Sequence, residues 1–119
     1  QYAHARICSI FKEAERRSIA LQPEMADIGY LDNNESIIIL KLLAKYPEEI
    51  SDAAETFEPH KISTFLLRLA QSYHRFYAEQ RVLSEDEVKT QTNLALCDAV
   101  RITIKNGLHI LGVSAPESM

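Results

Sequence analysis

The sequence predicts an all-α domain, a helical bundle of about five helices. Only three glycines and four prolines occur in 119 residues, too few for the frequent turns of an all-β fold. Hydrophobic residues make up 46% of the chain and charged residues 25%, as expected of a globular domain with its own core. Apolar residues also recur at the three- and four-residue spacing of helices along most of the chain.

The first predicted helix covers residues 1–20, and a connector over residues 21–32 follows it. In the connector, Met25, Ile28 and Leu31 are expected to pack onto the core. The helix has apolar residues at i, i+4, i+7, i+8 and i+11, with most charged residues off this stripe. The stripe consists of Ala3, Ile7, Ile10, Phe11 and Ala14.

The second predicted helix runs from about residue 33 to 45. Asp32 and Glu35 resemble a capping box, in which a side-chain oxygen accepts a hydrogen bond from a free amide of the first turn. A third helix is expected to begin at Pro47, because a first helical turn tolerates a residue without an amide proton.

The fourth predicted helix follows Pro59 and covers about residues 60–82. Its apolar stripe is Ile62, Phe65, Leu66, Leu69, Tyr73 and Phe76. The fifth begins at a capping box from Ser84 to Glu87 and is expected to end at Gly107. The alternating run VRITI at 100–104 is interpreted as part of this helix. The expected inner stripe is Val88, Thr92, Ala95, Ala99 and Ile102.

Composition excludes several classes of protein. The net charge of −4 argues against a broad electrostatic grip on nucleic acid, so any such contact has to be local. No apolar run approaches the ~20 residues that span a bilayer, and a soluble, cytoplasmic protein without a membrane partner is expected. Cys8 and Cys97 lack a CxxC pattern or a nearby histidine pair, which leaves a disulfide framework and a zinc site without support.

No catalytic constellation is visible, and neither a catalytic residue nor a metal nor a cofactor is predicted for this chain. The sequence has no phosphate-binding glycine loop, HExxH or GxSxG, and its four histidines lack ligand spacing. Acidic pairs such as Glu48 and Glu49 occupy expected first turns of helices, where the helix dipole accounts for them.

A set of tyrosines and arginines at helical spacing remains. Tyr73, Tyr77 and Arg81 follow one another at i, i+4 and i+8, and Tyr2 and Arg6 form a similar pair. Such side chains are able to stack on unpaired RNA bases. Tyrosines beside an apolar stripe are also common as core edges whose hydroxyl reaches solvent, and spacing alone favours this structural interpretation.

Five stretches of the sequence together resemble one known family. They are QYAHAR at 1–6, LLRLAQSYHRFY at 66–77, DAVR at 98–101, NGLHILGV at 106–113 and APESM at 115–119. In order, and over essentially the whole chain, they are similar to the C-terminal anticodon-binding domain of arginyl-tRNA synthetases. That domain is named DALR after the quartet that reads DAVR here.

The resemblance implies a single all-helical anticodon-binding domain over residues 1–119. It implies an upstream class I catalytic domain in a parent enzyme that joins arginine to its tRNA with ATP and Mg²⁺. The HIGH-like and KMSK-like signatures of such a domain do not occur here. The start at Gln1 is therefore expected to be a cut and Met119 a natural end. The implied partners are the anticodon loop of arginine tRNA and the catalytic domain of the parent chain.

The resemblance also implies where the RNA binds. Arginine codons are CGN and AGR, so every arginine tRNA has cytosine in the middle of its anticodon. A pocket for this unstacked base is expected at Tyr2, Tyr77 and Met119, with Arg81 beside them either stacking or contacting the RNA backbone. The candidates for phosphate contacts, each equally compatible with a solvated helix face, are Arg6, Arg75, Arg101 and Lys105.

A rival interpretation is a helical protein–protein interaction module without an RNA role, which the net negative charge favours. A broad exposed apolar patch is the sign of such a module, whereas a small aromatic pocket is the sign of an RNA reader.

Overall fold

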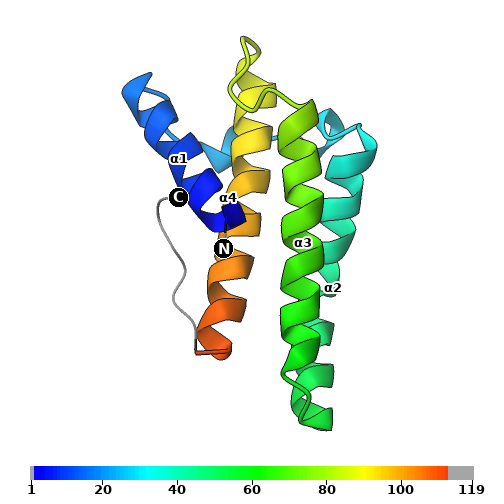
Figure 1. Cartoon of the computed structure of the whole chain (residues 1–119). Coiled ribbons are helices and arrows are strands. Elements are labelled where there is room, and N and C mark those ends of the chain that lie inside the picture. Colours follow the sequence, from blue (N-terminus) through cyan, green and yellow to red (C-terminus); the bar gives the residue numbers. More distant parts are fainter. Residues whose placement is uncertain (1, 113–119) are drawn as a thin grey trace.

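Four α-helices and two short 3₁₀ helices make up residues 2–112, the part of the chain that the computed structural model describes. Helices α2 and α3 run antiparallel side by side, and α4 runs back along α3 (Figure 1). Helix α1 packs against α4 and α3. In chain order the elements are α1 (Tyr2–Arg16), η1 (Pro23–Met25), η2 (Ile28–Tyr30), α2 (Asn34–Thr56), α3 (His60–Glu79) and α4 (Glu87–Ile110). None of the helices within this range is long and apolar enough to cross a membrane.

The predicted all-α class is confirmed, but α2 is one helix where two were predicted. Pro47 lies inside α2, because the apolar face keeps its helical spacing on both sides of the proline. The residues of this face are Ile39, Leu42, Leu43, Tyr46, Ile50 and Ala53, which are buried or packed against the core. A proline within a helix costs about 3 kcal/mol. Burial of a continuous face against α3 offsets that cost.

Helix α4 is the central element, since it contacts the other three helices and both 3₁₀ helices. Its buried residues therefore surround the helix, and the predicted inner stripe is only partly correct. Thr92 is buried, whereas Val88, Ala95 and Ala99 are half-buried. Ile102 is 53% exposed, whereas Leu94, Ile104 and Leu108 are buried. The expected stripes of α1 and α3 are confirmed, except that Phe11 is only partly buried.

The prediction that α4 ends at Gly107 is wrong, because this glycine lies inside the helix. A Cβ atom at this position would lie 2.7 Å from Cδ1 of Leu66 on α3. The glycine therefore permits the close approach of α3 and α4. The chain takes up a positive φ of 78° at Gly112, after the end of the helix.

Other helix ends also differ from the predicted ones. Helix α1 ends four residues early because Ser18 adopts φ 60°, and the amide of Ile19 donates to the carbonyl of Ala14, as in a Schellman motif. Asn33 caps α2 through the amide of Ser36, and Asp86 caps α4 through the amide of Lys89, so the predicted capping boxes at Asp32 and Ser84 are wrong by one and two residues.

Buried polar residues near the start of α4, TQTN at 90–93, form hydrogen bonds with the α1–α2 and α3–α4 connections. Gln91 donates to the carbonyl of Ala20 at 2.9 Å and accepts from the amide of Gln22 at 2.7 Å. Thr92 accepts from the amide of Asp27 at 2.9 Å. These bonds hold the first connector on α4. The prediction that Ile28 in this connector packs onto the core is wrong, because its side chain is 70% exposed.

Candidate nucleic-acid interface

A groove of about 700 Å³ opens between α1 and the C-terminal end of α3 with the loop after it. Ile10 and Val82 give it apolar wall area, and both are largely buried. The polar lining comes from Arg6, Glu13, Arg17, Tyr77, Gln80 and Arg81. The arginines in this lining outnumber its single carboxylate, so the groove is cationic on a chain whose net charge is −4.

Arg6 and Tyr77 meet across the groove. The Cζ atom of Arg6 lies 4.3 Å from the centroid of the Tyr77 ring, within the range of a cation–π contact. Nη1 of Arg6 also lies 3.1 Å from Nδ1 of His74, one turn before Tyr77 on α3. The Tyr77 side chain is 40% exposed, so an aromatic surface remains open to a ligand.

Hydrogen bonds from α4 hold the loop that carries Arg81 in place. The side-chain amide of Asn93 on α4 donates through Nδ2 to the carbonyls of Arg81 and Val82, at 3.5 and 3.3 Å. The hydroxyl of Thr90 accepts from the backbone amide of Ser84 and donates to its carbonyl, both at 3.0 Å. Arg81 itself is exposed and has no ion pair among the described residues. Its guanidinium is therefore available to an anionic ligand.

The structure thus gathers Arg6, Tyr77 and Arg81 at one place, although α1 and α3 are far apart in sequence. Tyr2 lies on α1 one turn before Arg6 and is 69% exposed, but it does not line the groove. Met119 falls outside residues 2–112, so its expected role stays a prediction.

Three other candidates for phosphate contact lie away from the groove. Arg75 is bonded to Glu35 of α2 at 3.2 Å. Arg101 is bonded through Nε to Asp98 at 3.1 Å, with its Cζ 6.0 Å from the ring of Phe11 on α1. Lys105 is exposed on α4. Their expected contacts with phosphate remain predictions.

Tyr73 belongs to the core and not to a stacking surface. Its side chain is fully buried, and its hydroxyl lies 3.5 Å from Sγ of Cys97. Burial raises the pKa of the Tyr73 hydroxyl far above its ordinary value and raises the pKa of the Cys97 thiol to about 12. Both groups stay protonated. The interpretation of Tyr73 as a structural residue is correct, but its hydroxyl does not reach solvent as expected, because it is buried against Cys97. Cys8 and Cys97 are both free thiols.

Sequence reasoning missed four residues of this region, namely Glu13, Arg17, His74 and Gln80. One signal was available for His74, which stands three residues before Tyr77 and so on the same face of the helix. Arg17 and Glu13 are an i, i+4 pair, bonded at 2.9 Å, on the side of α1 that faces the end of α3. That orientation follows from tertiary packing.

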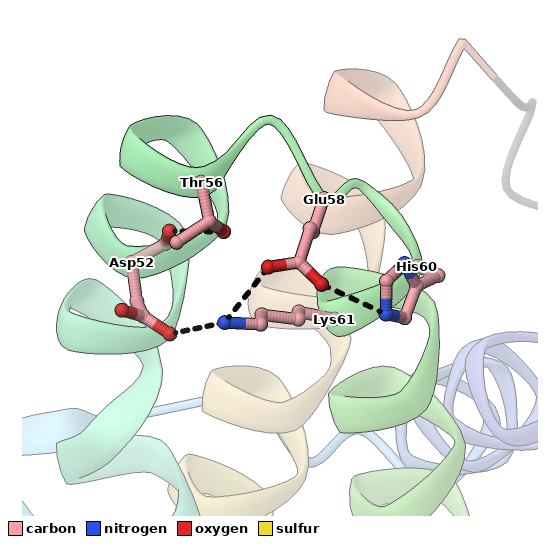
Figure 2. A network of polar contacts seen from close by, with 5 residues as sticks. All are labelled: Asp52, Thr56, Glu58, His60 and Lys61. Atoms are coloured by element: carbon pink, nitrogen blue, oxygen red, sulfur yellow. Dashed lines mark hydrogen bonds and ion pairs between the residues drawn. The ribbon is translucent and has the colours of Figure 1, made fainter.

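The opposite end of α3 carries a second polar cluster, at the turn from α2 (Figure 2). Nζ of Lys61 lies 2.9 Å from a carboxylate oxygen of Asp52 and 3.4 Å from one of Glu58. Nε2 of His60 lies 3.5 Å from the other oxygen of Glu58. Hydrogen bonding by Thr56 and the charge of Lys61 lower the pKa of the Glu58 carboxyl.

An all-helical bundle with a cationic, aromatic groove fits the class of domains that bind unpaired nucleic acid. The sequence matches the family of the DALR anticodon binding domain over residues 1–119, and the chain belongs to that family. The predicted resemblance is therefore confirmed.

Relatives and a solved structure agree with this assignment. The chain is 43% identical over its whole length to an arginine–tRNA ligase of Staphylococcus epidermidis, of which it covers 21%. It is 48% identical to an arginine–tRNA ligase of Desulfosudis oleivorans, of which it covers 22%. A crystal structure described as a putative arginyl-tRNA synthetase of Campylobacter jejuni matches 99% of the chain, with a TM-score of 0.81 and 28% identity, and 25% of that protein is covered. The chain thus spans about a fifth of the length of these curated relatives.

Proposed function

We propose that this domain binds the anticodon loop of arginine tRNA as the anticodon reader of an arginyl-tRNA synthetase. The observation that carries the proposal is the match of the whole chain to an anticodon-binding family. The names of the relatives supply the amino acid. The rival interpretation as a protein-interaction module has no comparable support.

The proposed binding site is the groove between α1 and the end of α3. A splayed base would stack on the Tyr77 ring, and Arg81 would contact a neighbouring phosphate. The guanidinium of Arg6 only donates hydrogen bonds. It therefore suits the O2 and N3 acceptors on the Watson–Crick edge of cytosine better than uracil, whose N3 carries a proton.

The parent protein is proposed to attach arginine to tRNA with ATP and Mg²⁺ in the cytoplasm. Its catalytic domain would lie in the four-fifths of the relatives' length that this chain does not cover. In this proposal the present domain contributes recognition, and the reaction takes place on the other domain.

A competition titration tests the proposal. Anticodon stem-loops of arginine tRNA with C or U at the middle position compete for the 119-residue chain at low salt, where phosphate contacts are strongest. We expect a preference for C. Equal affinity for both loops would contradict base reading by this domain, and the absence of binding to either would contradict binding by the domain alone.

A further inference from the structure

His74 connects to the groove through one contact, the bond to Arg6. Nδ1 of His74 lies 3.1 Å from Nη1 of Arg6, and the same guanidinium stands 4.3 Å over the centre of the Tyr77 ring. Arg6 comes from α1, whereas His74 and Tyr77 lie one turn apart on α3. The side chain of Arg6 thus joins α1 to α3 at the groove through its contacts with His74 and Tyr77.

The chemistry of the contact fixes the state of the imidazole. A guanidinium has five N–H donors and no acceptor, so Nδ1 of His74 has to accept. The ring is therefore the neutral tautomer with its proton on Nε2. Partial burial lowers the pKa of His74, and the charge of Arg6 lowers it further, which agrees with this assignment.

Arg6 differs from the paired arginines of the molecule in its partners. Arg75, Arg101 and Arg17 each bond to a carboxylate. Within residues 2–112, Arg6 has no carboxylate partner, and its recorded contacts are a neutral ring nitrogen and an aromatic face. The arrangement fixes the guanidinium in place but leaves its charge and most of its donors unused.

We propose that His74 is a positioning residue of the groove, which holds the Arg6 guanidinium against Tyr77 so that its free donors face the RNA. The consequence for RNA rests on the proposed function. A long arginine side chain loses rotamer freedom when it binds a ligand, and prior fixation by His74 reduces that loss. His74 acts through Arg6 and need not touch the RNA.

A double-mutant cycle with Arg6 tests the role in binding. His74→Leu removes the acceptor, and we expect it to weaken binding of the C stem-loop about three- to tenfold, whereas His74→Asn, which keeps an acceptor near Nδ1, retains most of the affinity. In an Arg6→Gln background, His74→Leu should have no further effect. His60→Leu is the matched control, because His60 lies on the same helix about 21 Å away at the other polar cluster (Figure 2).

A second readout needs no RNA. Nitrogen NMR of the histidine rings should find Nδ1 of His74 unprotonated at neutral pH, and Arg6→Gln should raise the pKa of His74 by removing a nearby positive charge. A protonated Nδ1, or a pKa that Arg6→Gln leaves unchanged, would overturn the positioning role. If circular dichroism finds His74→Leu unfolded, His74→Asn and the NMR titration still decide the question.

The outcomes separate this inference from the proposed function. A wild-type chain that prefers C, together with a His74→Leu variant that binds as tightly as wild type, overturns the inference and leaves the function standing. A wild-type chain with no preference for C contradicts the proposed function, and the NMR measurements then judge the Arg6–His74 contact by themselves. An equal loss for His74→Leu with and without Arg6 would show that His74 acts by another route.

Discussion

Both ends of α3 carry basic side chains, but the two ends differ in how many of these side chains are paired with a carboxylate. At the turn from α2, Lys61 has two carboxylates within 3.4 Å and His60 has one at 3.5 Å (Figure 2). At the groove, Arg6 bonds to a neutral histidine and stands over a tyrosine. Arg81 has no ion pair in the described part of the chain. Lys61 is thus paired with carboxylates at one end, whereas at the groove Arg17 is paired with Glu13 and, among the described residues, Arg6 and Arg81 have no carboxylate partner.

This contrast explains how an acidic chain carries a cationic groove. The net charge of −4 is a sum over the whole chain, whereas a phosphate responds to charges within about one Debye length, about 10 Å at 0.1 M salt. In the proposed function, RNA therefore binds where the cations have no carboxylate partner. The variants that follow compare the two ends directly, beginning with the largest expected effect.

Removal of an aromatic ring should give the largest difference in stem-loop affinity between the two ends of α3. We expect Tyr77→Ala to weaken stem-loop binding by ~1 to 3 kcal/mol, or about 5- to 150-fold, because a stacking surface is lost. Phe57, at the α2–α3 turn, is 91% exposed, and Phe57→Ala should leave affinity unchanged. Titration with the C stem-loop measures both. Equal effects of the two substitutions would remove the distinction between the ends.

Substitution of a cation at each end should change the salt dependence of binding. Each phosphate contact to a single strand contributes about 0.7 to the slope of log affinity against log salt. Arg81→Gln should lower the slope by about this amount, whereas Lys61→Gln, whose cation is already paired, should not change it. Titrations at several salt concentrations give the slopes. A smaller slope for Lys61→Gln would mean that RNA contacts α3 at the turn from α2, which would contradict binding at the groove.

Sequence patterns predicted most of the fold, because helical spacing is a local property. The stripes of α1 and α3 followed from spacing, and the helical state of residues 100–104 was also correct. The failures arose where tertiary contacts override local signals. Pro47 is tolerated because α3 packs along both halves of α2, and Gly107 serves a close approach to Leu66.

The site was predictable only in part. Helical spacing singled out Tyr77, Arg6 and Arg81 as candidates, and the resemblance to a family assigned them to an RNA site. Spacing alone did not distinguish buried Tyr73 from half-exposed Tyr77. The contact between Arg6 and Tyr77 joins residues 71 positions apart, which no local pattern encodes. Glu13 and Arg17 joined the groove for the same reason, since the rotation of α1 is set by its packing on α4.

Substitution of Glu13, in the groove, is expected to strengthen stem-loop binding, whereas the substitutions above weaken it. Its carboxylate bonds to Arg16 at 2.7 Å and Arg17 at 2.9 Å, and it repels an incoming phosphate. Glu13→Gln should therefore tighten stem-loop binding by ~0.2 to 1 kcal/mol, the scale of an exposed ion pair. Glu15→Gln is the matched control, because it removes the same charge from α1 outside the groove lining. Equal tightening by both would point to net charge as the cause.

The smallest expected effect concerns stability at the α2–α3 turn. The pKa of Glu58 is lowered by a hydrogen bond from Thr56 and by the charge of Lys61, so its ionised form is favoured in the folded chain. A carboxyl with a lowered pKa contributes stability above its unfolded pKa and loses it as pH falls through the folded value. Glu58→Gln should therefore lower the melting temperature slightly at pH 7, and the difference should vanish in acid, once the carboxyl is protonated in both the folded and the unfolded chain.

Thermal unfolding of both chains, followed by circular dichroism from pH 7 down into the acid range, measures this difference. Because Glu58 is far from the groove along α3, its substitution should leave stem-loop affinity unchanged. A difference in melting temperature that persists after the carboxyl is protonated would mean that the side chain stabilises the turn through packing and not through its charge. A change in affinity would mean that the paired end of α3 also contacts RNA, which would contradict the contrast between the two ends.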